Sequence, residues 1–243
     1  MCSVVILRLG DTVCVTMNRD ESRARVPELP PTRWSNGLVA PRDGSAGGTW
    51  IGFMPNGAWA CLLNSYEPVI LTAHRPSRGL LAPTILAAED PEQLLETMDL
   101  SNYNPFRIVM GNTCNATLYH WDGKTLRRRA ISVLPYFVSS SSWQAEIVLA
   151  ERNITFRMWQ QANMPHDRLG RPLLHLWQEP ESPETGILMR RIEPHTTSRT
   201  QIRLGKGQSP EMEYWPGHHL PPVGRDAFSY PHMTKRGALR WPG

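Results

Sequence analysis

The chain has 243 residues, of which 40% are hydrophobic and 20% are charged, and its formal net charge is +4 at pH 7. This composition indicates a folded globular chain and excludes a disordered one. We expect no transmembrane segment, because no apolar stretch approaches the ~20 residues that cross a bilayer. We also expect no signal peptide, because the apolar run over residues 4–7 is short and Arg8 interrupts it.

The basic residues and the cysteines exclude further classes. The arginine clusters 127–129 and 190–191 come without a nucleic-acid-binding motif, so we interpret them as solvated faces and predict no nucleic-acid partner. No Cys-x-x-Cys pair occurs, and the histidines lack metal-ligand spacing. We therefore predict no disulfide framework, no metal and no cofactor, and we expect free thiols in a reducing, cytoplasmic compartment. The four cysteines are Cys2, Cys14, Cys61 and Cys114.

The first predicted element is a β-hairpin. Apolar and β-branched residues fill 4–9 and 12–17, and Gly10-Asp11 separates the two runs. Because a hairpin reverses the chain, it returns residues 18–21 to the neighbourhood of residue 2.

The next segments are a long connection and a second hairpin. Residues 22–46 are rich in proline, arginine and glycine, which predicts an irregular loop. Residues 50–53 and 58–63 are apolar, and Asn56-Gly57 between them is a strong turn signal.

The second half of the chain mixes helices and strands. Its spacing predicts, in order, a helix capped by Asp90 that runs to Met98, strands at 106–111, 116–121 and up to 131, a helix over 142–163, a short helix at 173–176 and a strand at 198–204. The apolar stripe of the long helix is predicted to contain Ile147, Ala150, Ile154 and Met158. The pattern favours an α+β fold of residues 1–204, followed by a proline-rich, mostly irregular tail over 205–243.

Cys2 is the most informative residue. It is small enough for Met1 to be removed, which leaves a thiol and a free α-amino group on one residue. An α-amino group titrates near pH ~8 and a thiol near ~8.5, so the amine can act as a general base toward its own thiol. The motif Asn18-Arg19-Asp20-Glu21 then supplies a carboxylate and a guanidinium to orient the amine and favour the thiolate. The alternative is that Cys2 is only a buried residue of the first strand.

Five motifs occur in order along the chain: Met1-Cys2, Asn18-Arg19-Asp20-Glu21, Gly47-Gly48-Thr49-Trp50-Ile51-Gly52, Leu62-Leu63-Asn64 and Thr197-Ser198-Arg199-Thr200. Together they resemble the NRDE family, also called the Transport and Golgi Organization 2 family. The resemblance is densest over residues 1–68 and weaker to about residue 204. It implies an N-terminal-nucleophile hydrolase fold, a four-layer αββα sandwich related to bile-salt hydrolases and other linear-amide amidases.

The resemblance also implies roles for individual residues. Cys2 would be the nucleophile, Arg19 and Asp20 would order its amine and thiolate, Asn64 would help to form the oxyanion hole, and Arg199 would line the site. The family usually has a Ser-Asn pair before its long helix, where this chain has four serines, 139–142. A serine hydroxyl is a shorter donor than an amide. Ser140 would therefore have to supply the second oxyanion donor, or the amidase chemistry is weakened.

Each motif also has a purely structural interpretation. Gly47-Gly48 can serve as a tight turn with positive φ, and Asn64 can cap a strand. Arg19 and Asp20 can form a structural ion pair. The serine run can cap the helix that begins near residue 142.

The functional alternatives follow the same division. The first hypothesis is a hydrolase-like protein that acts on a small-molecule amide or thioester. The second is a non-catalytic carrier or chaperone for heme or an acyl-lipid-type apolar ligand, because the family has been implicated in heme trafficking and lipid homeostasis. A third is a structural role in secretory organisation, as the family name implies. The sequence makes no prediction of the oligomeric state.

Overall fold

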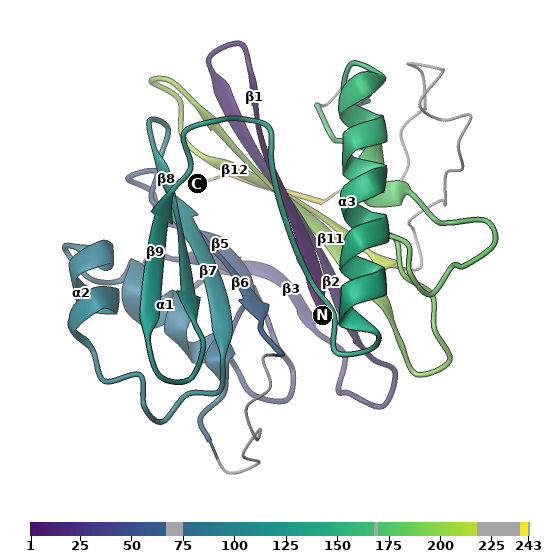
Figure 1. Cartoon of the computed structure of the whole chain (residues 1–243). Coiled ribbons are helices and arrows are strands. Elements are labelled where there is room, and N and C mark those ends of the chain that lie inside the picture. Colours follow the sequence, from purple (N-terminus) through teal and green to yellow (C-terminus); the bar gives the residue numbers. More distant parts are fainter. Residues whose placement is uncertain (67–74, 168–169, 218–238, 243) are drawn as a thin grey trace.

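Two antiparallel sheets lie face to face, and helices cover their outer sides (Figure 1). The structure, a computed structural model, describes residues 1–66, 75–167, 170–217 and 239–242. The long helix packs on one sheet and the two short helices pack on the other, so the layers run helix, sheet, sheet, helix. The α+β, four-layer αββα prediction is confirmed.

The first sheet contains the N-terminal hairpin at its centre. In spatial order its strands are β10 (Tyr136–Ser140), β1 (Cys2–Leu9), β2 (Thr12–Ser22), β11 (Pro194–Gly205), β12 (Glu211–Pro216) and β13 (Leu239–Pro242). On its outer side lie α3 (Ala145–Gln161) and the 3-10 helix η2 (Leu173–Leu176). The predicted hairpin, late strand and short helix are confirmed.

The second sheet follows chain order from edge to edge. Its strands are β3 (Leu29–Arg33), β4 (Val39–Arg42), β5 (Ile51–Phe53), β6 (Trp59–Asn64), β7 (Phe106–Gly111), β8 (Ala116–Trp121) and β9 (Leu126–Ala130). Its helices are η1 (Arg78–Leu80), α1 (Leu81–Leu86) and α2 (Pro91–Thr97). Asp90 caps α2 by accepting the N–H of Gln93, as predicted. The second hairpin is also confirmed, with Gly57 at φ +89° in its turn.

Strand β1 explains why its sequence is apolar without alternation. Val4 and Ile6 point into the core between the sheets, whereas Val5 and Leu7 pack on the other side with Trp159 of α3. Both faces of the strand are therefore buried, which is the situation that produces a continuous apolar run. The hairpin is consequently fixed on both sides, and its open end with Cys2 has a defined position.

The stripe predicted for the long helix is wrong by one position. Ile147 and Ile154 are 53% and 55% exposed, and the buried residues are instead Val148, Arg152, Thr155 and Trp159. The prediction failed because an arginine occupies the centre of the buried face, a position where a hydrophobic pattern expects an apolar residue.

Two segments predicted to be irregular contain strands. Within 22–46, β3 and β4 form an edge of the second sheet. Within 205–243, β12 and β13 extend the first sheet, so the prediction of an irregular tail is wrong for these residues. Prolines obscured both regions in the sequence, although proline is tolerated in edge strands. Residues 218–238 lie outside the described part of the chain.

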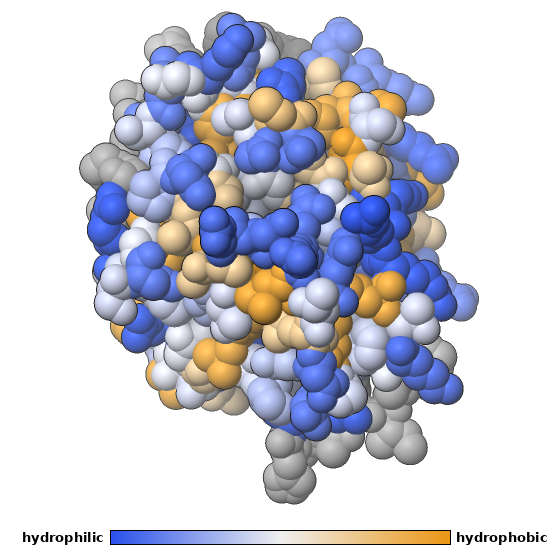
Figure 2. Space-filling view, turned by 90° about the vertical axis from the view of Figure 1, so that its left-hand side faces the viewer, coloured by the Kyte–Doolittle hydropathy of each residue, from blue (hydrophilic) through white to orange (hydrophobic). Residues whose placement is uncertain are grey.

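The face that contains α2 and β9 carries many hydrophilic residues, with apolar patches between them (Figure 2). Arg127 and Arg128 lie there, exposed and paired with Asp122 and Glu96. This agrees with the interpretation of the cluster 127–129 as a solvated face. Among the described residues, no helix is long and apolar enough to cross a membrane.

Candidate active site

A cavity of about 540 Å³ lies at the open end of the first hairpin, and residues from both sheets line it. Four of the six predicted site residues border this cavity: Cys2, Arg19, Asp20 and Asn64. The hairpin therefore returns the motif to Cys2, as its topology predicts.

Cys2 begins β1 and is held on both sides by neighbouring strands. It pairs with Arg19 of β2 and with Ser140 of β10. Its backbone N–H donates to Ser140 Oγ at 3.2 Å, and only 7% of the residue is exposed. Burial raises the pKa of the Cys2 thiol above its ordinary value. With Met1 attached, the geometry thus holds a protonated thiol at the cavity wall.

Met1 continues the strand by one more residue. Its amine donates to the carbonyl oxygen of Asp20 at 3.0 Å, and the Asp20 N–H donates to the Met1 carbonyl oxygen at 2.9 Å. Its Sδ lies 3.2 Å from Arg191 Nη1. Met1 is therefore an ordered part of the sheet, and the nitrogen of Cys2 is a peptide nitrogen that has no basic lone pair.

The Arg19 side chain joins a cluster of charges at the cavity. It donates to Glu28 at 2.7 Å and to Asp43 at 2.6 Å, and it lies over the ring of Trp50 at 4.5 Å. Burial would raise the pKa of Asp43, but its bonds to Arg25 and to the backbone lower it below the ordinary value. The cluster keeps an ionised, hydrogen-bonded wall beside Cys2.

The Asp20 carboxylate lies in a second network on the helix side of the sheet. Thr196 Oγ1 donates to it at 2.7 Å, and Arg152 of α3 pairs with it at 3.3 Å. Both charged side chains are completely buried. Arg152 also donates to Ser139 Oγ at 2.8 Å, and Ser139 Oγ donates to the Cys2 carbonyl oxygen at 3.3 Å. The network therefore connects Asp20 to the backbone of Cys2 through α3 and β10.

No ion pair between Arg19 and Asp20 forms, so the structural alternative drawn from the sequence is wrong in its partners. Consecutive residues of a strand point to opposite faces. Each residue instead finds partners of its own on its own side of the sheet.

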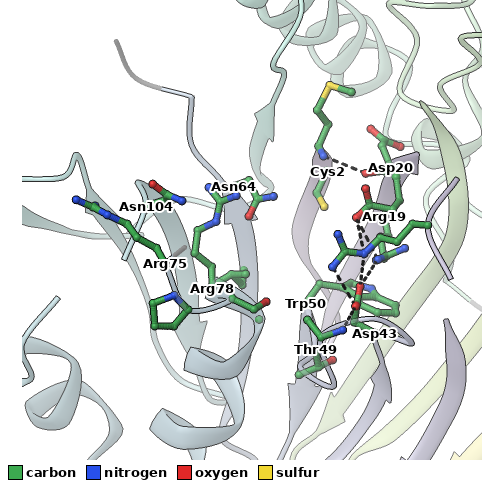
Figure 3. A pocket seen from close by; sticks show the side chains of 18 residues that line it. Cys2, Arg19, Asp20, Asp43, Thr49, Trp50, Asn64, Arg75, Arg78 and Asn104 are labelled. Carbon is green, nitrogen blue, oxygen red and sulfur yellow. Dashed lines mark hydrogen bonds and ion pairs between the residues drawn. The ribbon is translucent and has the colours of Figure 1, made fainter. Parts of the chain in front are cut away.

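Asn64 and Arg78 lie on the opposite wall of the cavity (Figure 3). Asn64 ends β6, and its side chain faces the sulfur of Cys2 across the gap (Figure 3). Arg78 donates to the Pro105 carbonyl at 2.8 Å, and burial lowers the pKa of its guanidinium. The Asn64 amide and the Arg78 guanidinium thus lie across the cavity from the Cys2 thiol.

Gly47-Gly48 explains how the wall that contains Arg78 is held close to the loop before β5. Gly47 has φ +71°, as the turn interpretation predicts. At Gly48, a Cβ would lie 2.4 Å from the carbonyl carbon of Gly79, so only glycine fits. The Thr49 N–H donates to the Gly79 carbonyl at 2.9 Å. This contact of two backbones fixes Arg78 at the cavity.

The serine run takes positions that differ from both interpretations. Ser139 and Ser140 end β10, and Gln144 at φ +40° precedes the helix with no side-chain cap. Ser140 is absent from the residues that line the cavity, and its hydroxyl is occupied with the nitrogen of Cys2. The geometry places Ser140 at the nitrogen rather than at the oxyanion, and the N-cap interpretation is wrong.

Arg199, like Ser140, is a predicted site residue that does not line the cavity. It is buried on the helix side of β11, over the ring of Trp215 at 4.6 Å. Burial lowers its pKa to about 9. The prediction failed because β11 has a bulge between Thr196 and Ser198, which changes the face that each later residue occupies.

Sequence reasoning missed Arg152, Asp43 and Arg78. Arg152 had a detectable signal, since it shares a helical stripe with Val148 and Trp159. Asp43 lies in a loop and Arg78 begins the short 3-10 helix η1, and in neither place does a periodicity mark a residue as functional. Among the described residues, no three side chains of the metal-binding types are grouped to hold a metal ion.

The model of the Transport and Golgi organisation 2 family matches residues 1–209. The chain belongs to this family.

A search of curated proteins gave no significant match. In structure the chain is similar to an N-acylethanolamine-hydrolyzing acid amidase ortholog from Caenorhabditis elegans, at 12% identity and TM-score 0.53, covering 100% of this chain and 99% of that chain. It is also similar to a variant of conjugated bile acid hydrolase from Clostridium perfringens, at 11% identity and TM-score 0.54, covering 88% and 89%. These likenesses show the N-terminal-nucleophile hydrolase fold.

The side chains of the family motif, residues 18–21, thus lie on both sides of the first sheet. Arg19 and Glu21 form the ionic wall of the cavity. Asn18 and Asp20 fasten the strand to the segments behind it, and Asn18 Nδ2 donates to the carbonyls of His175 and Ile187. The motif builds the cavity wall and anchors the strand that holds Met1 and Cys2.

Proposed function

We propose that the protein is a hydrolase whose nucleophile is the Cys2 thiol after removal of Met1, and that it acts on a linear amide or thioester. The observation that carries the proposal is the Cys2 sulfur facing Asn64 across a polar cavity (Figure 3). The two structural relatives, both named for hydrolysis, support the same class of reaction.

Removal of Met1 would create the general base of the reaction. It converts the Cys2 nitrogen from a peptide N–H into an α-amine, which titrates near pH ~8. That amine lies two bonds from the carbon that carries the thiol, and Ser140 Oγ already holds the nitrogen. The amine takes the thiol proton, which overcomes the effect of burial on the thiol pKa.

The thiolate then attacks the carbonyl carbon, and a carbon–sulfur bond forms. The carbonyl oxygen becomes an oxyanion, to which the Asn64 amide can donate. The Cys2 ammonium returns its proton to the leaving amine or thiolate, and the carbon–nitrogen or carbon–sulfur bond of the substrate breaks. Water, deprotonated by the same amine, hydrolyses the acyl-enzyme and releases a carboxylic acid.

Intact-mass measurement with a panel of acyl thioesters tests the proposal. We expect a chain without Met1 to gain one acyl group at residue 2, and a Cys2→Ala chain to gain none there. Cys114 is the exposed cysteine of the described residues, so a Cys114→Ser background removes non-specific labelling. Retained Met1 in the native host, or binding without an acyl-enzyme, would contradict the hydrolase and favour a carrier.

The role of Asn64 has its own test. An Asn64→Ala chain should form the acyl-enzyme about 10²–10³-fold more slowly, because one oxyanion donor is lost. Asn56→Ala, in an exposed turn of the same hairpin, is the matched control. An equal rate in the Asn64 variant would exclude this residue from the oxyanion hole.

A further inference from the structure

A second cavity lies directly beyond Met1. Its volume is about 730 Å³, and Trp143, Arg191 and Ile192 contribute to its lining. Met1 lines both this cavity and the one that contains Cys2. Among the described residues, Met1 is therefore the residue that the linings of the two cavities share.

The second cavity has an apolar surface that the fold leaves uncovered. Ile192 is 95% exposed and Trp143 is 40% exposed. Exposed large hydrophobic residues gathered beside a cavity are typical of a ligand-binding groove. Arg191 stacks on Trp143 at 4.6 Å, and its Nη1 lies 3.2 Å from Met1 Sδ. The methionine side chain thus occupies the position where an apolar group meets the groove.

The two cavities differ in chemistry. Arg19, Asp43 and Arg78 make the cavity at Cys2 polar and charged. The surface of the second cavity is mainly apolar, although charged residues also contribute to its lining. A substrate that spans both would place a polar, reacting end at the thiol and an apolar chain beyond it.

We propose that Met1 is a plug, and that its removal joins the two cavities so that the second one accepts an aliphatic acyl chain of the substrate. The inference rests on the proposed function and names its substrate class, an amide or thioester of a long-chain acid. Removal of one residue then has two effects, since it creates the general base and opens the acyl groove.

Binding measurements on Cys2→Ala chains test the plug without any chemistry. One preparation keeps Met1, through expression under inhibition of methionine aminopeptidase, and the other begins at residue 2 after release from a cleavable tag. The probes are an acetyl and a dodecanoyl amide of one fluorescent amine. Each buried methylene contributes about a fourfold gain in affinity, so we expect the shorter chain to bind the dodecanoyl probe at least tenfold more tightly. The acetyl probe should not distinguish the preparations.

Two variants locate the acyl chain. Trp143→Ala and Ile192→Asp in the shorter chain should each weaken dodecanoyl binding about tenfold or more and leave acetyl binding unchanged. Ile147→Asp is the control, because Ile147 is 53% exposed on α3 and does not line the cavity. Equal dodecanoyl affinity with and without Met1, or an equal loss in the Ile147 variant, would overturn the plug. Failure of the hydrolase proposal would instead appear as a binding difference with no acyl-enzyme in the chain that retains Cys2.

Discussion

Arg19 and Asp20 are adjacent in β2, yet their side chains lie in two regions that differ in how many partners each charge has. Arg19 lies at the cavity, where each of its carboxylate partners keeps other donors, such as Arg25 on Asp43 and Tyr214 on Glu28. Asp20 lies in the interior, where Arg152 is the one cation paired with it among the described residues. The partners of Arg19 can replace one another, whereas Asp20 depends on Arg152. We therefore predict that substitution of Arg19 lowers the stability of the fold less than substitution of Arg152.

The largest expected effect is on the interior side. Arg152→Met leaves the Asp20 carboxylate buried without its cation, which should lower the free energy of unfolding by about 3–5 kcal/mol. Urea denaturation measures it. Arg157→Met, at an exposed position of the same helix, should change little. Adding Asp20→Asn to Arg152→Met should recover part of the loss; a loss below ~1 kcal/mol in the single variant would show that the pair is dispensable.

A substitution on the cavity side should lower the free energy of unfolding less. Arg19→Met removes bonds to Glu28 and Asp43, but both carboxylates keep other partners, so we expect a loss of about 1–3 kcal/mol. The rate of Cys2 acylation should fall more than the stability suggests, because the wall beside the thiol loses its cation. Acylation measured on the folded fraction checks this; stability lost with an unchanged rate would make Arg19 structural only.

The comparison also explains which parts of the structure the sequence reveals. The first hairpin, its return to Cys2 and the turn at Gly47 follow from local patterns, because short apolar runs and turn residues encode them directly. Arg152 and the place of Arg199 do not follow, since each depends on a contact between distant segments or on a bulge. Likewise Ser140 was identified from its position before the helix, but its partner is set by the register of β10 on β1.

A pH dependence should appear on the interior side. Burial, with Arg199 and Arg152 nearby, holds the pKa of His175 well below its ordinary value of 6.5. The folded state keeps the ring neutral, while the unfolded state binds a proton below pH ~6.5. Stability is therefore complete above that pH and falls on acidification, by up to about 1.4 kcal/mol per pH unit from this group. His175→Gln should flatten the profile between pH 6.5 and 5 in urea titrations, whereas the same change at exposed His166 should not. An unchanged slope in the His175 variant would assign the acid sensitivity elsewhere.

The smallest effect, and the sharpest distinction, concerns Ser140. Its hydroxyl accepts the Cys2 N–H, so Ser140→Ala should cost about 1 kcal/mol of stability. In the chain without Met1 the same hydroxyl would hold the catalytic amine. Its loss should therefore slow acylation less than tenfold, far less than the loss of an oxyanion donor, and should move the midpoint of the pH–rate profile because the amine loses its hydrogen-bond partner. Ser140→Thr keeps the hydroxyl and should keep the midpoint.

An oxyanion donor would behave differently, because its removal lowers the rate by 10²–10³ at every pH and leaves the midpoint in place. The pH–rate profiles of the two variants and of Asn64→Ala, recorded with one thioester, would then show whether β10 serves the nitrogen of Cys2 or the oxygen of the substrate.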